Sequence, residues 1–178
     1  MGSRRTRVDT VIIQENFFES PDDIRELALQ QEFYSAKDHP HNVGGFPGMR
    51  TDYFNNIIPD FYDAIKNPIL SHIIKEDTKF SDYYLQTAFS YTLADTPCNK
   101  HVDFERGYMG YEQAYAGVTY LNPNPPENSG TSVEDGYAAN VYNRFVMYDA
   151  FKEHYPAGSF GYTKEDGRMV MTYFLLLK

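Results

Sequence analysis

The sequence predicts an α+β protein, mainly β, in which helices come first and strands follow. Helical spacing of apolar residues is confined to residues 1–82. Runs with strand character fill residues 83–178, and no Gly-, Ser- or Pro-rich linker separates the two parts. The length of 178 residues suits one domain that buries most of its apolar surface. We therefore expect a single domain, 1–178.

The first part of the chain contains strand, helix and loop signals. Residues Asp9–Ile13 read as a short strand. A helix is expected to begin after Ser20, because this residue is a good N-cap, Pro21 suits the first helical position, and two aspartates follow. Residues 35–50 hold two prolines and three glycines, which predicts a loop.

A second helical region is expected over Ile58–Glu76, where isoleucines recur at helical spacing and Pro68 should interrupt the helix. The later residues alternate between apolar and polar side chains or form short apolar runs between turns. The strands expected there are Tyr84–Leu93, His101–Glu105, Ala114–Leu121, Arg144–Tyr148, a short piece at His154, and Arg168–Leu177.

Composition narrows the class of partner. The formal net charge of -9 and the pI near 4.9 disfavour nucleic acid, whose binding needs clustered cations. No apolar run is long enough to cross a membrane. Cys98 is the single cysteine, so no intramolecular disulfide can form, and we expect a cytoplasmic location. The oligomeric state stays open.

Two histidines and an aspartate form a candidate metal site. Side chains two apart in a strand share a face, so His101 and Asp103 would point toward the same ion. A His-x-Asp triplet is common by chance. His154 strengthens the interpretation, because the intervening strands can carry the chain back beside the pair. Two imidazoles and a carboxylate can occupy one face of an Fe(II) octahedron and leave positions open, as non-haem iron oxygenases require.

Arg168, at the start of the last expected strand, is a candidate anion-binding residue. A buried arginine needs an anion, and its planar fork matches a carboxylate. A hydroxyl of Thr172 or Tyr91 could add a hydrogen bond. The competing interpretation is a structural salt bridge with an acidic neighbour, Glu165 or Asp166.

The order His101-Val102-Asp103, then His154, then Arg168 in Gly-Arg-Met-Val-Met-Thr-Tyr-Phe resembles the Fe(II)- and 2-oxoglutarate-dependent dioxygenases, most closely the prolyl-hydroxylase-like branch. The resemblance covers roughly Tyr84 to Leu177. It implies a double-stranded β-helix, a jelly-roll or cupin-like fold, with supporting helices on the N-terminal side. Fe(II), 2-oxoglutarate and O2 would be the cofactor and cosubstrates, with Arg168 binding the distal carboxylate of 2-oxoglutarate.

The resemblance also implies the reaction. An amino-acid or peptidyl side chain would be hydroxylated, with release of succinate and CO2. Asp103 favours hydroxylation, because halogenating relatives have a small apolar residue at that ligand position. Val170 stands where many relatives have Ser or Thr, so Thr172 and Tyr91 are substitutes for the second cosubstrate anchor. Two other classes stay open: a non-catalytic cupin-type barrel that binds a metal or small molecule, and an oxygenase acting on nucleic-acid bases.

A small-molecule or peptide substrate would meet loops around the site. The segment 44–51 is the best candidate, and Arg50 in it could pair with an anionic group. Three tyrosines between the expected strands could line the pocket: Tyr108, Tyr111 and Tyr115. Three other histidines have no partner at ligand spacing and are expected in loops or at the surface: His39, His41 and His72.

Overall fold

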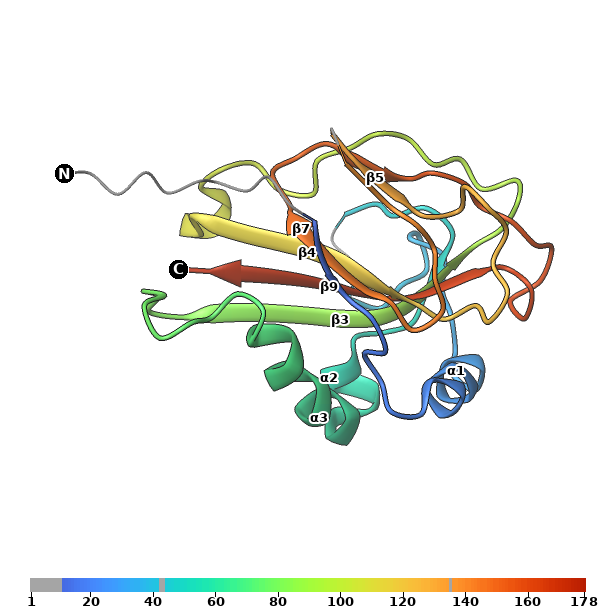
Figure 1. Cartoon of the computed structure of the whole chain (residues 1–178), viewed down its shortest axis with the longest axis horizontal. Helices are drawn as coiled ribbons and strands as arrows, with labels where there is room; N and C mark the ends of the chain where they lie inside the picture. The colour runs from blue at the N-terminus through green and yellow to red at the C-terminus, as the bar shows by residue number, and fades with distance from the viewer. Residues whose placement is uncertain (1–10, 42–43, 135) are drawn as a thin grey trace.

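The computed structural model (Figure 1) describes residues 11–41, 44–134 and 136–178. Its helices all precede the long strands and lie together on one side of the main sheet. They are α1 (Pro21–Leu29), α2 (Phe54–Ile57) and α3 (Pro59–Leu70), followed much later by a 3-10 turn, η1 (Tyr108–Gly110). None of the described helices is long and apolar enough to cross a bilayer.

The strands form two antiparallel sheets. The large sheet has six strands in the order β1-β7-β4-β9-β3-β2, and the small sheet has three in the order β6-β5-β8. The large sheet consists of β1 (Ile12–Gln14), β2 (Met49–Arg50), β3 (Tyr83–Thr92), β4 (Gln113–Tyr120), β7 (Phe145–Asp149) and β9 (Arg168–Leu177). The small sheet consists of β5 (Thr131–Val133), β6 (Gly136–Ala138) and β8 (His154–Pro156). The protein is therefore mainly β, with helices before the long strands.

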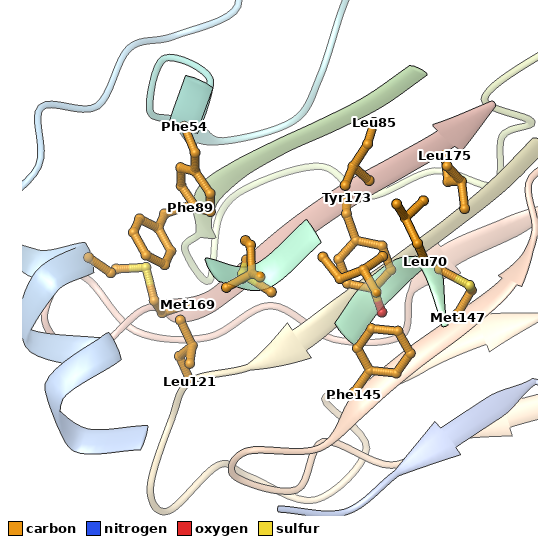
Figure 2. Packing of buried hydrophobic residues seen from close by; sticks show 14 of the residues in the cluster. Phe54, Leu70, Leu85, Phe89, Leu121, Phe145, Met147, Met169, Tyr173 and Leu175 are labelled. Atoms are coloured by element: carbon orange, nitrogen blue, oxygen red, sulfur yellow. The ribbon is translucent and has the colours of Figure 1, made fainter. Parts of the chain in front are cut away.

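Strand β9 lies between β3 and β4 and is covered on both faces. Alternate side chains of a strand point to opposite faces, so β9 divides its residues between two cores. Met169, Met171 and Tyr173 pack with the helices; Figure 2 shows Met169 near Phe89 and Tyr173 near Leu70 and Phe145. The residues between them face the small sheet. Burial on both faces explains the nearly continuous apolar run of this strand.

Most predicted elements are present with small shifts. Strand β9 has the bounds expected from the sequence, and α1 begins at Pro21 after Ser20, although the Ser20 side chain makes no capping hydrogen bond. Helix α3 ends at Leu70, before the expected Glu76. Pro68 lies inside the helix instead of breaking it, because so near the end it removes a single backbone hydrogen bond while Ile69 and Leu70 stay buried.

One expected strand is absent, four short elements were not expected, and one expected strand is shifted. Residues 101–105 do not form a strand: His101 makes one isolated bridge and the residues after it are irregular. The short elements α2, β2, β5 and β6 were not predicted, because a few residues carry too little periodicity. The strand expected at Asp9–Ile13 is found as β1 at Ile12–Gln14, and residues 9 and 10 lie outside the described part of the chain.

The missing side chain of Gly117 in β4 leaves room for the Tyr173 ring to lie across β4 and reach β7. The two residues are directly paired, and the Tyr173 hydroxyl donates to the carbonyl oxygen of Val146. A Cβ at position 117 would overlap that carbonyl oxygen and the Tyr173 ring.

We expect Gly117→Ala to lower the free energy of unfolding by about 1–3 kcal/mol, the usual cost of overpacking a core. Urea unfolding followed by circular dichroism measures it. Gly45→Ala is the matched control, because a Cβ there meets nothing within 4 Å. Equal stabilities of the two variants would contradict the packing argument.

Candidate active site

A pocket of about 520 Å³ lies between the two sheets. Its floor is the face of β9 that carries Arg168, Val170, Thr172 and Phe174, the alternation expected for one strand face. The loop before β2 and the segment before His101 form its rim. Pockets of about 300–1,000 Å³ are typical of small-molecule sites.

The main chain brings His101 and His154 together. The N–H of His101 donates to the His154 carbonyl at 3.1 Å, and the N–H of His154 donates to the His101 carbonyl at 3.0 Å. This reciprocal pair is an isolated antiparallel bridge, and it leaves the two rings 4.5 Å apart. His154 is held on its other side by β5, where it pairs with Val133. The expected meeting of the two histidines thus results from a bridge that joins β8 to the irregular segment.

Asp103 completes the cluster. Its Oδ1 lies 3.4 Å from Nε2 of His101, and its Oδ2 lies 2.9 Å from Nε2 of His154. One donor atom from each of the three residues falls within 4.8 Å of the other two. The sequence argument placed His101 and Asp103 on one strand face. They do meet, but through an irregular backbone instead of a strand.

The hydrogen bonds of both imidazoles fit a metal site. Nδ1 of His101 lies 2.8 Å from the Asn99 carbonyl, and Nδ1 of His154 lies 2.9 Å from the Lys152 carbonyl. A carbonyl oxygen can only accept, so each Nδ1 carries the proton and, in the neutral ring, each Nε2 keeps a lone pair. Such carbonyl partners orient metal-binding histidines.

The carboxylate also fits. Oδ2 of Asp103 is buried and has no hydrogen-bond partner among the described residues. With neutral imidazoles, two lone pairs would face each other across the 2.9 Å between Oδ2 and His154 Nε2, which is unfavourable unless a cation lies among them. Two imidazole nitrogens and one carboxylate are the donor set of a facial Fe(II) site. The residues present therefore fit a divalent metal ion.

The electrostatics of the cluster agree with this geometry. The Asp103 carboxylate beside it raises the pKa of His101 above its usual value. Burial by itself raises the pKa of Asp103, but the two imidazoles outweigh burial and hold that pKa below its usual value. The Asp103 carboxyl is therefore ionised at neutral pH, as a ligand must be.

Arg168 is buried on the floor of the pocket and belongs to no salt bridge among the described residues. Nε donates to the Ser129 carbonyl at 2.9 Å, and Nη2 donates to the Gly130 carbonyl at 3.1 Å and to the Thr131 hydroxyl at 3.3 Å. Neither Glu165 nor Asp166 neutralises it. Nη1 stays available for an anion, and burial lowers the pKa of the guanidinium without discharging it.

The two hydroxyls considered beside Arg168 lie on different faces. Thr172 is on the pocket face, and its hydroxyl donates to the Ala88 carbonyl at 3.4 Å. Tyr91 pairs with Met169 on the face that packs with the helices, and its ring contacts Phe33. Tyr91 is nevertheless among the residues that line the pocket, so its role as an anchor stays a prediction. Thr92, which pairs directly with Arg168, lies on the correct face and was missed.

Of the residues proposed to contact the substrate, some line the pocket and others do not. Arg50 and the segment 45–47 line the pocket. Tyr115 lies on the helix face of β4, Tyr108 packs on Phe104 in the exposed turn η1, and the Tyr111 ring stacks under the Lys178 ammonium. None of the three tyrosines lines the described pocket.

The remaining histidines have partners that the spacing did not reveal. His39 lies in a loop, as expected, but it is buried and bonds through Nε2 to the Thr51 carbonyl at 2.8 Å. His41 pairs with Asp52 at 2.8 Å. His72 is half-buried and stacks on Phe145. All three lie away from the pocket.

Two further side chains at the site were missed. Tyr148 on β7 stacks on His154 with ring centroids 4.7 Å apart, and Thr131 bonds both to Arg168 and to the Tyr120 hydroxyl. The alternation of β7 could have indicated Tyr148, because Val146 and Tyr148 face the small sheet. Nothing local in the sequence indicates Thr131.

Comparison with known proteins rests on structure. No family model matches the sequence, and no curated protein matches it significantly. HygX from Streptomyces hygroscopicus, solved with nickel and 2-oxoglutarate bound, is similar at a TM-score of 0.67 and 11% identity, over 93% of this chain and 82% of that one. A Pseudomonas putida prolyl-4-hydroxylase has a TM-score of 0.62 and 12% identity, over 96% and 93%.

A 2OG-Fe(II) oxygenase family protein from Burkholderia pseudomallei is also similar, with a TM-score of 0.63 and 12% identity over 96% of this chain and 85% of that one. These structures share the fold of the chain. At 11–12% identity, the likeness is one of fold.

We expect Ni(II), used in place of readily oxidised Fe(II), to raise the melting temperature of the protein, because a ligand that binds the folded state stabilises it. Asp103→Asn should weaken Ni(II) binding by about tenfold or more, since it removes the anionic ligand. Isothermal titration measures the affinity. Glu105→Gln is the control, because it neutralises an exposed carboxylate on the same segment. Unchanged affinity in Asp103→Asn would exclude the site.

Proposed function

We propose that the protein is an Fe(II)- and 2-oxoglutarate-dependent oxygenase that hydroxylates an amino-acid or peptidyl side chain and releases succinate and CO2. The observation that carries this proposal is the cluster of His101, Asp103 and His154, whose ligand atoms lie within 4.8 Å of one another in a pocket that also holds Arg168. The shared fold supports it, because the similar structures include one with nickel and 2-oxoglutarate bound.

Each residue has a distinct role. His101, Asp103 and His154 would hold Fe(II), which supplies the activation of O2 when it is bound. Arg168 would bind the distal carboxylate of 2-oxoglutarate through Nη1, while its other nitrogens stay on the carbonyls of 129 and 130. Thr172 and Thr131 are the hydroxyls placed to assist it. The apolar wall of Val118, Val170 and Phe174 limits access of water.

The finer architecture belongs to the same proposal. The two facing sheets would form a double-stranded β-helix in one oxygenase domain, 1–178, with residues 1–82 as the supporting part and 83–178 as the core. The order of the strands and the fold shared with prolyl hydroxylases support this. A small-molecule or peptide substrate and a cytoplasmic location stay predictions.

The direct test is succinate formation. Anaerobically purified protein supplied with Fe(II), 2-oxoglutarate and O2 should form succinate slowly even without substrate. Absence of succinate in protein that binds Fe(II) would favour a non-catalytic cupin-type barrel. Salt-dependent binding of single-stranded DNA would favour an oxygenase acting on bases.

We expect Arg168→Gln to weaken 2-oxoglutarate binding by about tenfold or more, because the charge-assisted contact from Nη1 is lost. Isothermal titration of the Ni(II)-loaded protein measures it. Arg168→Gln also removes hydrogen bonds to carbonyls, so Arg25→Gln is the matched control: Arg25 donates to the Leu121 and Glu165 carbonyls outside the pocket. An Arg168 variant that binds 2-oxoglutarate as the Arg25 variant does would exclude the assigned role.

A further inference from the structure

The backbone of Arg50 is fixed on the rim of the pocket. Its N–H donates to the Tyr34 carbonyl at 2.9 Å, and the Tyr34 N–H donates to the Arg50 carbonyl at 2.8 Å. On its other side, Arg50 pairs with Ser90 of β3, which also lines the pocket. Arg50 is thus held by neighbours on two sides and directs its side chain into the cavity.

The guanidinium of Arg50 has aromatic neighbours and no direct ion pair among the described residues, although the charge of the Asp103 carboxylate raises its pKa somewhat. Its carbon lies 4.2 Å from the centre of the Phe46 ring and 5.8 Å from that of Phe174. Nε is buried without a hydrogen-bond partner, and no carboxylate of the described residues forms an ion pair with Arg50. Aromatic faces attract the cation but cannot accept its several N–H groups.

Burial of an unpaired cation is costly, and the effect is visible in its ionisation. Desolvation lowers the pKa of Arg50 to about 10. Aromatic stacking offsets part of the cost of burying the charge but does not neutralise it. An anion bound between Arg50 and the floor of the pocket would neutralise the buried guanidinium and remove this cost.

The charges in the pocket indicate how many negative charges are missing. Asp103 is the one carboxylate among the described lining residues, and Arg50 and Arg168 are the two arginines. A divalent metal ion and the dianion of 2-oxoglutarate would cancel each other, and Asp103 would cancel one arginine. One positive charge is then unbalanced. Arg168 is held by carbonyl oxygens, whereas Nε of Arg50 has no hydrogen-bond partner, so we assign the unbalanced charge to Arg50.

We infer that the substrate carries a carboxylate and that Arg50 binds it. The inference rests on the proposed oxygenase function, and among the amino-acid and peptidyl substrates of that function it favours a free amino acid, which always has an α-carboxylate. A carboxylate matches the planar fork of arginine and supplies the local negative charge that the Arg50 guanidinium lacks. The rings of Phe46 and Phe174 hold the guanidinium in place, so the substrate finds it already oriented.

The test compares each standard L-amino acid with its α-carboxamide, which has the same side chain but no negative charge. Both sets are added to the protein with Fe(II), 2-oxoglutarate and O2, and succinate is measured by NMR. We expect at least one amino acid to raise succinate formation severalfold above the level without substrate while its amide does not. Equal stimulation by acid and amide, or no stimulation by any amino acid, would overturn the inference.

Variants identify the residue responsible. Arg50→Gln should lose the preference for acid over amide, with each rate taken relative to the same variant without substrate, and Arg50→Lys should keep part of it. Arg106→Gln is the control and should keep the full preference, because Arg106 also stacks on a ring, at 4.8 Å from Phe151, but lies outside the pocket. If Arg50→Gln weakens 2-oxoglutarate binding as strongly as Arg168→Gln, Arg50 serves the cosubstrate and the inference is wrong.

A second measurement needs no substrate. Arg50→Met keeps the packing of the stem and removes the unpaired charge, so the melting temperature of the ligand-free protein should not fall. A lower melting temperature would show that Arg50 is structural. If the parent protein forms no succinate at all, the oxygenase proposal fails, whereas a parent that forms succinate but does not distinguish acid from amide contradicts only the role of Arg50.

Discussion

Burial of β9 on both faces is the constraint on which the rest of the structure depends. One face of this strand packs on the helices, and the other forms the floor of the pocket. Since alternate residues serve the two faces, a shift of one residue in the pairing with β3 or β4 would move Arg168 into the helical core and Met169 into the pocket. Fold and site are therefore specified by the same register.

The small sheet has only three short strands, but it supplies essential parts of the site. Its strand β8 carries His154, and the turn before β5 provides the carbonyls that hold Arg168. Short strands gain stability from pairing on both sides, and β8 has β5 on one side and the His101 bridge on the other. The candidate metal ligands therefore lie where two weakly stable segments meet: strand β8, which carries His154, and the irregular segment that carries His101 and Asp103. A bound cation would join these two segments.

Long elements and the order of site residues could be predicted from the sequence, whereas short elements and side-chain orientation could not. Strand β9 was predicted with its bounds, and His101, Asp103 and His154 do lie together. The backbone at Asp103 is irregular because a bridge to distant His154 fixes it, and no local pattern encodes that contact. The side-chain direction of Tyr91 could not be predicted, because it depends on pairing with Met169, which is equally nonlocal.

The bonds from Arg168 to the carbonyls at 129 and 130 have a mechanical consequence. Arg168 belongs to the large sheet, and those carbonyls directly precede β5 of the small sheet. The Arg168 side chain therefore links the two sheets and helps to set the spacing between them. The separation between the candidate ligand cluster and the anion anchor is thus determined before any ligand arrives. A diacid that contacts both the cluster and Arg168 would therefore have to match a separation that the protein itself sets.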